Sequence, residues 1–321
     1  MEELVLVGAL VVAFVNGAND NFKGVATLYG SGTLSYRGAL TFGTLATALG
    51  GIASLVFAVA LVRAFSGKGL VPDAALSPAL LASVALAAGS TVLLATRLGF
   101  PVSTTHSLVG GLVGAGWVVA GSELNVGVLG GAFALPLVAG PLIATGLAWL
   151  GLRLQRGVGR KPTDRRLRSA SELRALTVGH VLSGGLASFG RGLNDTPKIL
   201  GLLVGASVLS PALGVFAITG AMALGGLLAA RRVAETLARR ITPMTPAQGL
   251  VANCVTALLV TGASPMGLPL STTHVSTGGI FGIGIDTGGL RWQAVGGILS
   301  AWVTTLPLAA ALGAGFMWGL R

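Results

Sequence analysis

The chain has 321 residues, of which 53% are hydrophobic and only 10% are charged, and its mean hydropathy is +0.83. A soluble globular protein carries about 25% charged residues, and an apolar surface this large would aggregate in water. The net charge of +11 comes largely from two basic stretches without interleaved aromatic residues. This pattern is typical of cytoplasmic loops that fix orientation in a lipid bilayer, and it disfavours a nucleic-acid partner. The composition predicts an integral membrane protein.

The apolar runs are long and continuous, as in membrane helices, rather than short and alternating, as in lipid-spanning barrels. In chain order they cover residues 3–18, 21–35, 38–63, 76–97, 103–120, 126–151, 173–190, 196–213, 214–232, 246–263, 271–287 and 292–318. Several are shorter than the about 20 residues that a spanning helix needs. Because the short runs border polar motifs, we expect broken or re-entrant helices around a central substrate site.

An internal duplication divides the chain. Residues 98–116 align without gaps on residues 266–284, and ten of the nineteen positions are identical. We therefore expect a first transmembrane repeat at 1–151, a basic cytoplasmic loop at 152–172 and a second repeat at 173–321. Because corresponding loops of the two repeats differ in their content of Lys and Arg, the repeats are predicted to be inverted, as in many secondary transporters.

Each repeat carries a Ser-Thr-Thr-His motif at the start of a glycine-rich segment. The hydroxyl residues are Ser103, Thr104 and Thr105 in the first repeat and Ser271, Thr272 and Thr273 in the second. Ser and Thr cap helix N-termini, where free N–H groups and a partial positive charge attract anions. Two such ends near a pseudo-symmetry axis would bind a tetrahedral oxyanion. The alternative is that these side chains only cap their own helices.

Each repeat also places an Asn-Asp pair in an apolar region, at Asn19–Asp20 and at Asn194–Asp195. A charge at the bilayer centre costs at least about 2.5–3.5 kcal/mol, and such residues usually mark ion or substrate pathways. A carboxylate beside a bound anion requires a cation partner, either a metal ion or an ammonium group. Amide and carboxylate oxygens suit a hard cation such as sodium, so sodium ions are expected at Asp20 and Asp195. No other cofactor is expected.

The stretches "GANDNFKG", "GLNDTPKI", "PVSTTH", "PLSTTH" and "RRVAETLARRITPMTPAQGLVAN" resemble the inorganic phosphate transporter (PiT) family of sodium- or proton-coupled symporters. The resemblance covers nearly the whole chain. It implies a homodimeric bundle of inverted repeats, with phosphate between the Ser-Thr-Thr half-helices. It also implies sodium at the Asn-Asp motifs, with cation contacts from Asn19, Asp20, Asn194 and Asp195.

The chain departs from the family pattern at Lys23 and Lys198, where the family has an Asn three residues after the Asp. Two of the four lysines of the chain thus occupy equivalent points of the repeats. On a helix, Asp and Lys at this spacing share a face and can pair. We hypothesise that the ammonium groups replace bound sodium wholly or partly, which makes transport weakly sodium-dependent, proton-coupled or uniporting. The alternative is that both lysines snorkel to a membrane interface.

Arg191 aligns with Asn16 of the first repeat. Its guanidinium group either grips the oxyanion in bidentate fashion or anchors a helix end at the headgroups. We include it with Lys23 and Lys198 among the candidate substrate contacts, because all three would make the site more cationic than the family pattern.

The remaining polar residues receive structural interpretations. His106 and His274 are expected to bond to backbone in a bent segment rather than to accept a transported proton, although histidine suits that role. Glu235 has no acidic counterpart in the first half and is expected to pair with Arg231 or Arg239 on a helix.

These observations predict a multi-pass transporter of the plasma (inner) membrane that carries inorganic phosphate by alternating access. Sulfate is the alternative substrate, but Asp20 and Asp195 could accept a hydrogen bond from a P–OH group, which favours phosphate. A membrane enzyme with a Ser or Thr nucleophile and a His base is disfavoured, because adjacent residues on one helical turn rarely give the required geometry. A channel is a third possibility.

Overall fold

The structure is a computed structural model that describes residues 1–125, 127, 135–157 and 169–321. Every regular element in these ranges is helical, and they contain no β-strand. Six of their helices are long and apolar enough to cross a membrane, namely α1 (Glu2–Asp20), α3 (Tyr36–Phe57), α5 (Pro78–Leu98), α10 (Pro211–Ala229), α12 (Pro246–Ala263) and α14 (Trp292–Gly319). The predicted all-α membrane fold is confirmed.

The other long helices are α6 (Thr104–Ala120), α8 (Leu135–Gly157), α9 (Ala170–Gly205) and α13 (Thr272–Thr287). Shorter elements connect them. These are α2 (Ala26–Gly30), α4 (Val59–Ala64), α11 (Arg231–Glu235) with the π-helical turn Thr236–Arg240, and the 3₁₀ turns Asp73–Ala75 and Gly121–Glu123.

The two Asn-Asp motifs differ in backbone structure. The first breaks a helix as predicted, because α1 ends at Asp20 and a turn over residues 21–25 precedes α2. The predicted break between the segments 173–190 and 196–213 is wrong, because α9 runs continuously through the second motif and through Pro197. Both α3 and α12 pack extensively on α9, and this tertiary packing outweighs the local cost of a helix-interior proline.

Part of the predicted segment 126–151 and part of the predicted loop 152–172 lie outside the described residues. Helices extend into both ends of that loop, since α8 continues to Gly157 and α9 begins at Ala170. The start of α9 is a capping box, in which Ser169 Oγ accepts from the Glu172 N–H and the Glu172 carboxylate accepts from the Ser169 N–H.

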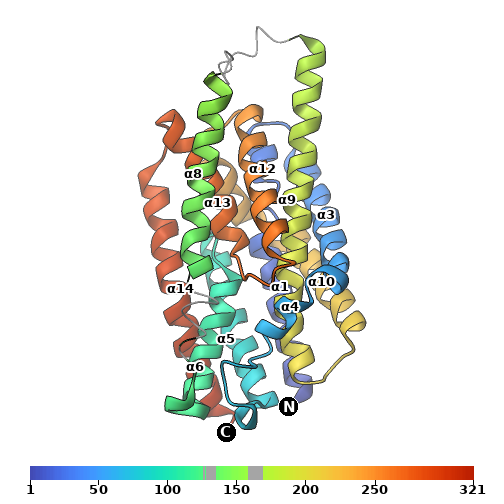
Figure 1. Cartoon of the computed structure of the whole chain (residues 1–321), viewed down its shortest axis with the longest axis vertical. Coiled ribbons are helices and arrows are strands. Elements are labelled where there is room, and N and C mark those ends of the chain that lie inside the picture. The colour runs from blue at the N-terminus through green and yellow to red at the C-terminus, as the bar shows by residue number, and fades with distance from the viewer. Residues whose placement is uncertain (126, 128–134, 158–168) are drawn as a thin grey trace.

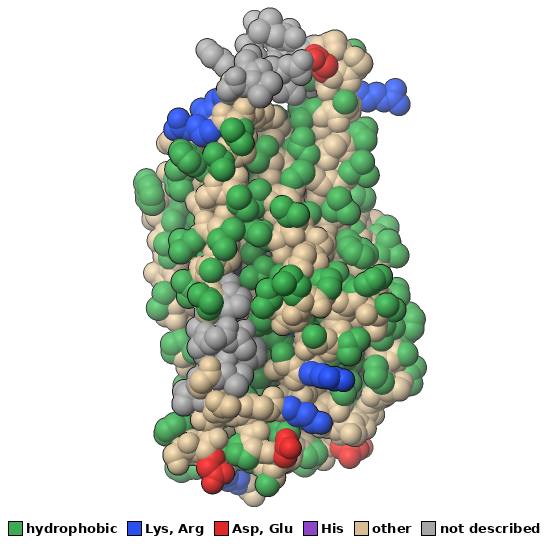
Figure 2. Space-filling model, viewed as in Figure 1, with side chains coloured by type: hydrophobic (Ala, Val, Ile, Leu, Met, Phe, Trp, Pro, Cys, Tyr) green, Lys and Arg blue, Asp and Glu red, His purple; other side chains and the backbone are tan. Residues whose placement is uncertain are grey.

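The molecule is an elongated bundle in which both termini lie at one end, whereas α8 ends and α9 begins at the other (Figure 1). Figure 2 shows a broad band of hydrophobic side chains between two ends where charged side chains gather. This distribution matches a bilayer-spanning protein. Since Lys and Arg accumulate on the cytoplasmic side, the end with the α8 and α9 termini is the expected cytoplasmic end.

Helices from the two halves of the chain interlock. Extensive helix contacts pair α3 with α9 and α10 with α1, and others pair α14 with α6 and α8 with α13. In each pair, one helix comes from residues 1–157 and the other from residues 170–321. The first and last helices of each half therefore pack on the other half.

Glycines at matching positions permit these crossings. A Cβ atom at Gly17 would lie 1.9 Å from Met222 O, and one at Gly192 would lie 2.0 Å from Thr47 O. Gly192 lies 175 residues after Gly17, and Met222 lies 175 residues after Thr47. The two Asn-Asp motifs are separated by the same 175 residues. The close approaches of α1 to α10 and of α9 to α3 are thus equivalent, and glycine is required because any side chain would meet backbone.

The two Ser-Thr-Thr helices, α6 and α13, start against each other. The Thr273 hydroxyl donates to Val102 O at 2.6 Å, and the ring centroids of His106 and His274 are 4.5 Å apart. From this meeting point α6 extends into the lower half of Figure 1 and α13 into the upper half. Both helix starts therefore face the middle of the bundle.

Candidate functional site

The polar motifs of both repeats meet in one buried cluster. The side chains of Asn16, Asn19, Asp20, Lys23, Ser103, Thr104, Thr105, Arg191, Asn194, Asp195, Lys198, Ser271, Thr272 and Thr273 are all at most 4% exposed. They come from the end of α1 and the turn after it, the middle of α9 and the starts of α6 and α13. The structure thus brings together every residue that the sequence singled out as a substrate or cation contact.

Both serines cap their own helices, as the simpler interpretation expected. Ser103 Oγ accepts from the His106 N–H at 3.1 Å, and Ser271 Oγ accepts from the His274 N–H at 3.2 Å. These bonds satisfy one of the free N–H groups of each helix start. They use an acceptor site of each serine and leave its O–H group able to donate to a ligand.

Lys23 lies at the centre of the first motif. Its ammonium group forms an ion pair with Asp20 and donates to the hydroxyl of Thr273. It also donates to the carbonyl of Val102 at 3.0 Å. The carboxylate and the carbonyl belong to the first repeat, whereas the hydroxyl belongs to the second.

Lys198 makes the corresponding contacts in the second motif. Its Nζ lies 3.2 Å from Asp195 Oδ1, 2.7 Å from Leu270 O and 2.8 Å from Thr105 Oγ1. It also donates to the Asn194 side-chain carbonyl. The carboxylate, the backbone carbonyl and the threonine hydroxyl occupy the same positions in the repeats as the three acceptors of Lys23. Here the carboxylate and the carbonyl belong to the second repeat and the hydroxyl to the first. The predicted pairing of each carboxylate with its own lysine is present in both halves.

The two asparagines of the motifs have different partners. Asn19 is bound to the linker between α5 and α6, where its amide donates to Phe100 O and accepts from the Val102 N–H, both at 3.0 Å. Asn194 donates to Ser264 Oγ at 3.0 Å and accepts from Lys198. Asn19 therefore holds the linker in place, and its predicted contact to a cation stays a prediction.

Arg191 is only 2% exposed, which excludes the interpretation that it anchors a helix end at the headgroups. Its Nη1 donates to Asn21 Oδ1 at 2.6 Å and its Nη2 to Asn16 Oδ1 at 2.5 Å. Its Nε lies 3.6 Å from Asp195 Oδ2 and has no hydrogen-bond acceptor among the described residues. A buried donor without an acceptor favours binding of an anion at this point.

Sequence reasoning missed two residues that position the guanidinium group. Asn16 receives one of its donors and also donates to Thr104 Oγ1 at 3.0 Å. Asn21 receives another and donates to Thr44 Oγ1 at 2.7 Å. A usable signal was present, because Asn16 lies four residues before Asp20 and thus on the same face of α1.

The cluster carries more positive than negative formal charge. It contains the cationic side chains of Lys23, Arg191 and Lys198 against the carboxylates of Asp20 and Asp195, all buried. Buried charges are tolerated when they are paired and hydrogen-bonded, and here both carboxylates are paired. The remaining positive charge favours binding of an anion over binding of a further cation.

His106 and His274 lie beside the cluster. The His274 and Trp302 rings contact each other at an interplanar angle of 35° with centroids 3.8 Å apart, and Trp302 Nε1 donates to Pro101 O at 3.0 Å. Both histidines line an apolar cavity of about 690 Å³ between α8, α13 and α14. Their rings thus face this cavity, while their backbone N–H groups bond to the capping serines.

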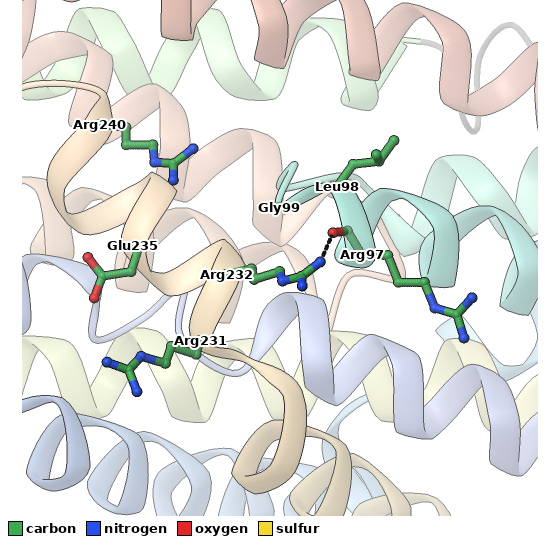
Figure 3. A pocket seen from close by; sticks show the side chains of 7 residues that line it. All are labelled: Arg97, Leu98, Gly99, Arg231, Arg232, Glu235 and Arg240. Carbon is green, nitrogen blue, oxygen red and sulfur yellow. Dashed lines mark hydrogen bonds between the residues drawn. The ribbon is translucent and has the colours of Figure 1, made fainter.

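A separate cavity of about 420 Å³ lies at the end of α5 and is lined by Arg97, Leu98, Gly99, Arg231, Arg232, Glu235 and Arg240 (Figure 3). Arg232 Nη1 donates to Arg97 O at 2.5 Å, the bond drawn in Figure 3. Thr236 Oγ1 donates to Gly99 O at 2.8 Å. Because Gly99 begins the linker to Ser103, the basic segment holds this linker from outside the cluster.

Glu235 pairs with Arg239, one of its two expected partners, at 3.7 Å. It also accepts from the Tyr29 hydroxyl at 2.8 Å, which joins α11 to α2. The contact to Arg239 is solvent-exposed and therefore weak.

Residues 16–313 match a family described as the phosphate transporter family. The chain belongs to this family. Among curated relatives, a probable low-affinity inorganic phosphate transporter of Mycobacterium tuberculosis (strain ATCC 25618 / H37Rv) is 33% identical, with 99% of this chain and 76% of the relative covered. A protein of the same description from Rhizobium meliloti (strain 1021) is 30% identical, with 96% and 94% covered.

Two further matches bear on substrate and coupling. The sulfate permease CysP of Bacillus subtilis (strain 168) is 27% identical, with 97% of this chain and 86% of the relative covered. A solved structure described as "The sodium-dependent phosphate transporter" superimposes with a TM-score of 0.85 at 25% identity, covering 99% of this chain and 98% of that one. The family resemblance expected from the motifs is confirmed, and the chain is a multi-pass transporter rather than an enzyme.

Proposed function

We propose that this phosphate transporter family member carries inorganic phosphate across the plasma membrane as a secondary active transporter. The observation that carries the proposal is the meeting of two Ser-Thr-Thr helix starts in a buried cluster with an excess of positive charge. A helix N-terminus favours anions, and guanidinium and ammonium groups supply charge-assisted donors. The low-affinity phosphate transporters among its relatives support the same substrate.

Phosphate would bind between the two helix starts, with contacts from Ser103, Thr104, Thr105, Ser271, Thr272, Thr273, Lys23, Lys198 and Arg191. The ammonium groups already bond to Thr105 and Thr273, so they point toward the hydroxyls of the opposite repeat. A phosphate oxygen would take the acceptor role that these hydroxyls have now. Arg191 Nε would gain the acceptor that it lacks.

Phosphate is favoured over sulfate by the two carboxylates. A phosphate ion near neutral pH carries a P–OH donor, whereas sulfate has none, and Asp20 and Asp195 are acceptors within the cluster. Asp195 Oδ2 already accepts from the Thr272 hydroxyl at 3.1 Å, which places a carboxylate oxygen at the start of α13. Sulfate remains the second candidate, because the related CysP is a sulfate permease.

Alternating access would proceed by movement of two inverted repeats about the central cluster. The interlocked pairs α1–α10 and α9–α3, the matching glycine contacts and the opposite directions of α6 and α13 support this relationship. A cation gradient, of sodium or protons, would drive accumulation, and the lysines that already pair with both carboxylates favour protons. A homodimer is the proposed assembly.

Uptake of ³²P-phosphate into liposomes that contain the purified protein tests the proposal. We expect saturable uptake that excess unlabelled phosphate and arsenate inhibit strongly and sulfate inhibits weakly. Thr105→Ala with Thr273→Ala should reduce kcat/KM for uptake at least about tenfold, whereas Thr304→Ala, at an exposed position of α14, should leave it unchanged.

Stronger inhibition by sulfate than by phosphate would assign the protein to sulfate transport instead. Uptake that fails to saturate, without counterflow of preloaded phosphate, would point to a channel and contradict the proposed carrier.

A further inference from the structure

The two buried ammonium groups each occupy a shell of oxygen atoms of three kinds. Around Lys23 these are a carboxylate, the Val102 carbonyl and a threonine hydroxyl. Around Lys198 they are a carboxylate, the Leu270 carbonyl and again a threonine hydroxyl. Val102 and Leu270 immediately precede the two Ser-Thr-Thr motifs, so these three contacts are equivalent in the two shells, and Lys198 has the Asn194 side-chain carbonyl as a further acceptor.

Shells of carboxylate, carbonyl and hydroxyl oxygens are typical of hard cations in proteins. A metal ion bound at either point would need the oxygens that the ammonium group uses, since Nζ lies within hydrogen-bond distance of each. The residues present therefore do not fit a sodium ion as long as the lysine is in place.

Neither lysine snorkels to an interface. Their exposed fractions are 2% for Lys23 and 1% for Lys198, and both lie in the central cluster. Both hydroxyl partners come from the opposite repeat, which a lysine reaching for water would not require. The predicted alternative of interfacial lysines is thus excluded by burial.

We propose that Lys23 and Lys198 are tethered cations that stand in the place of bound sodium, so that this protein transports its anion without sodium. The inference rests on the proposed function. A mobile cation has to bind again in every cycle, whereas a tethered ammonium stays with its carboxylate. The carrier can then reorient in a sodium-free medium, because Asp20 and Asp195 remain compensated throughout.

The hydrogen bonds of the two lysines also link the repeats to each other. Each ammonium group contacts the third residue of the opposite Ser-Thr-Thr motif, where the substrate is proposed to bind. An anion that displaces Thr105 and Thr273 as acceptors would change the link between the repeats directly. The lysines thus take over the sodium position both as counter-ions and as contacts to the substrate.

Two independent measurements test the inference. For the wild-type protein we expect ³²P-phosphate uptake that changes by less than about twofold when sodium replaces choline. Equilibrium binding of ²²Na⁺ to the purified protein, which requires no transport, should show no saturable component. Saturable ²²Na⁺ binding, or a sodium-dependent rise of about tenfold or more, would overturn the proposal.

The matched variants are Lys23→Asn with Lys198→Asn, and Lys68→Asn as a control at an exposed lysine outside the cluster. The double variant should gain both saturable ²²Na⁺ binding and sodium-dependent uptake, and the control should behave as wild type. A folded double variant that gains neither property would contradict the assigned role. If the double variant does not fold, the two wild-type measurements still decide the question.

Failure of the proposed function has a different signature. In that case the wild-type protein takes up no phosphate in any medium, while ²²Na⁺ binding still reports whether the ammonium groups exclude sodium.

Discussion

The two Asn-Asp-Lys motifs reach the same set of contacts from different backbones. The first lies where α1 ends and the chain turns, whereas the second lies inside the continuous helix α9. In both, the lysine three residues after the Asp bonds to that carboxylate, to a backbone carbonyl and to a threonine of the other repeat. The side-chain geometry is therefore preserved although the local secondary structure is not.

Within the cluster, the halves differ in charge at one pair of equivalent positions. Asn16 of the first repeat corresponds to Arg191 of the second, and the two side chains contact each other across the repeats. Each lies four residues before its Asp, and Asn16 Nδ2 is 3.2 Å from Asp20 Oδ2. Duplication thus supplies a symmetric frame, and one substitution supplies the net positive charge that distinguishes an anion site.

The largest effects are expected at the two equivalent helix crossings, α1 with α10 and α9 with α3. Gly17→Ala and Gly192→Ala each place a methyl group against backbone of the opposing helix, so each should lower the apparent melting temperature in detergent by about 6 °C or more. The control is Gly220→Ala in α10, where an added Cβ meets nothing within 4 Å. Equal decreases in melting temperature for both variants would support the equivalence of the two helix crossings. An unchanged melting temperature for Gly192→Ala would contradict it.

Removing the asymmetric charge should have the next largest effect. Arg191→Gln deletes charge-assisted hydrogen bonds within a buried cluster, so kcat/KM for phosphate uptake should fall about 10- to 100-fold. Arg191→Lys keeps the charge but loses the bidentate fork, and we expect it to recover only part of the loss.

Exchange of the two side chains tests whether the positions are interchangeable. The double variant Asn16→Arg with Arg191→Asn moves the guanidinium group to the first repeat and should transport better than Arg191→Asn alone. Uptake no better than that of the single variant would show that the halves are not equivalent around the anion.

A smaller effect is expected at Asn21. Its Oδ1 accepts from Arg191 at 2.6 Å, whereas the hydroxyl of its counterpart Thr196 donates to Met222 Sδ at 3.7 Å and to no oxygen or nitrogen among the described residues. Asn21→Ala should reduce uptake about threefold to tenfold through loss of this positioning contact, and Thr196→Ala should be close to neutral. The comparison of KM values separates substrate affinity from protein yield.

The smallest effect is expected at Glu235, which lacks an acidic counterpart in the first half. Glu235→Gln removes an exposed ion pair with Arg239 but keeps an acceptor for the Tyr29 hydroxyl, so uptake should change by less than about twofold. A large loss would instead assign a functional role to the basic segment around the cavity in Figure 3.

The sequence by itself determined the membrane class, most helix positions and most residues of the cluster. Continuous apolar runs located the helices, because the bilayer demands about 20 apolar residues per spanning helix. The doubled motifs identified Asp20, Lys23, Asp195 and Lys198, because repeated charges in apolar surroundings require a partner.

Only the tertiary structure decided how these parts connect. It showed α9 to be continuous through Pro197, because packing against α3 and α12 outweighs local propensity. It turned Asn19 toward the linker and brought Asn16 and Asn21 to Arg191. Such contacts join residues up to 250 positions apart, as Lys23 and Thr273 are, and no local pattern in the chain encodes which distant side chains will meet.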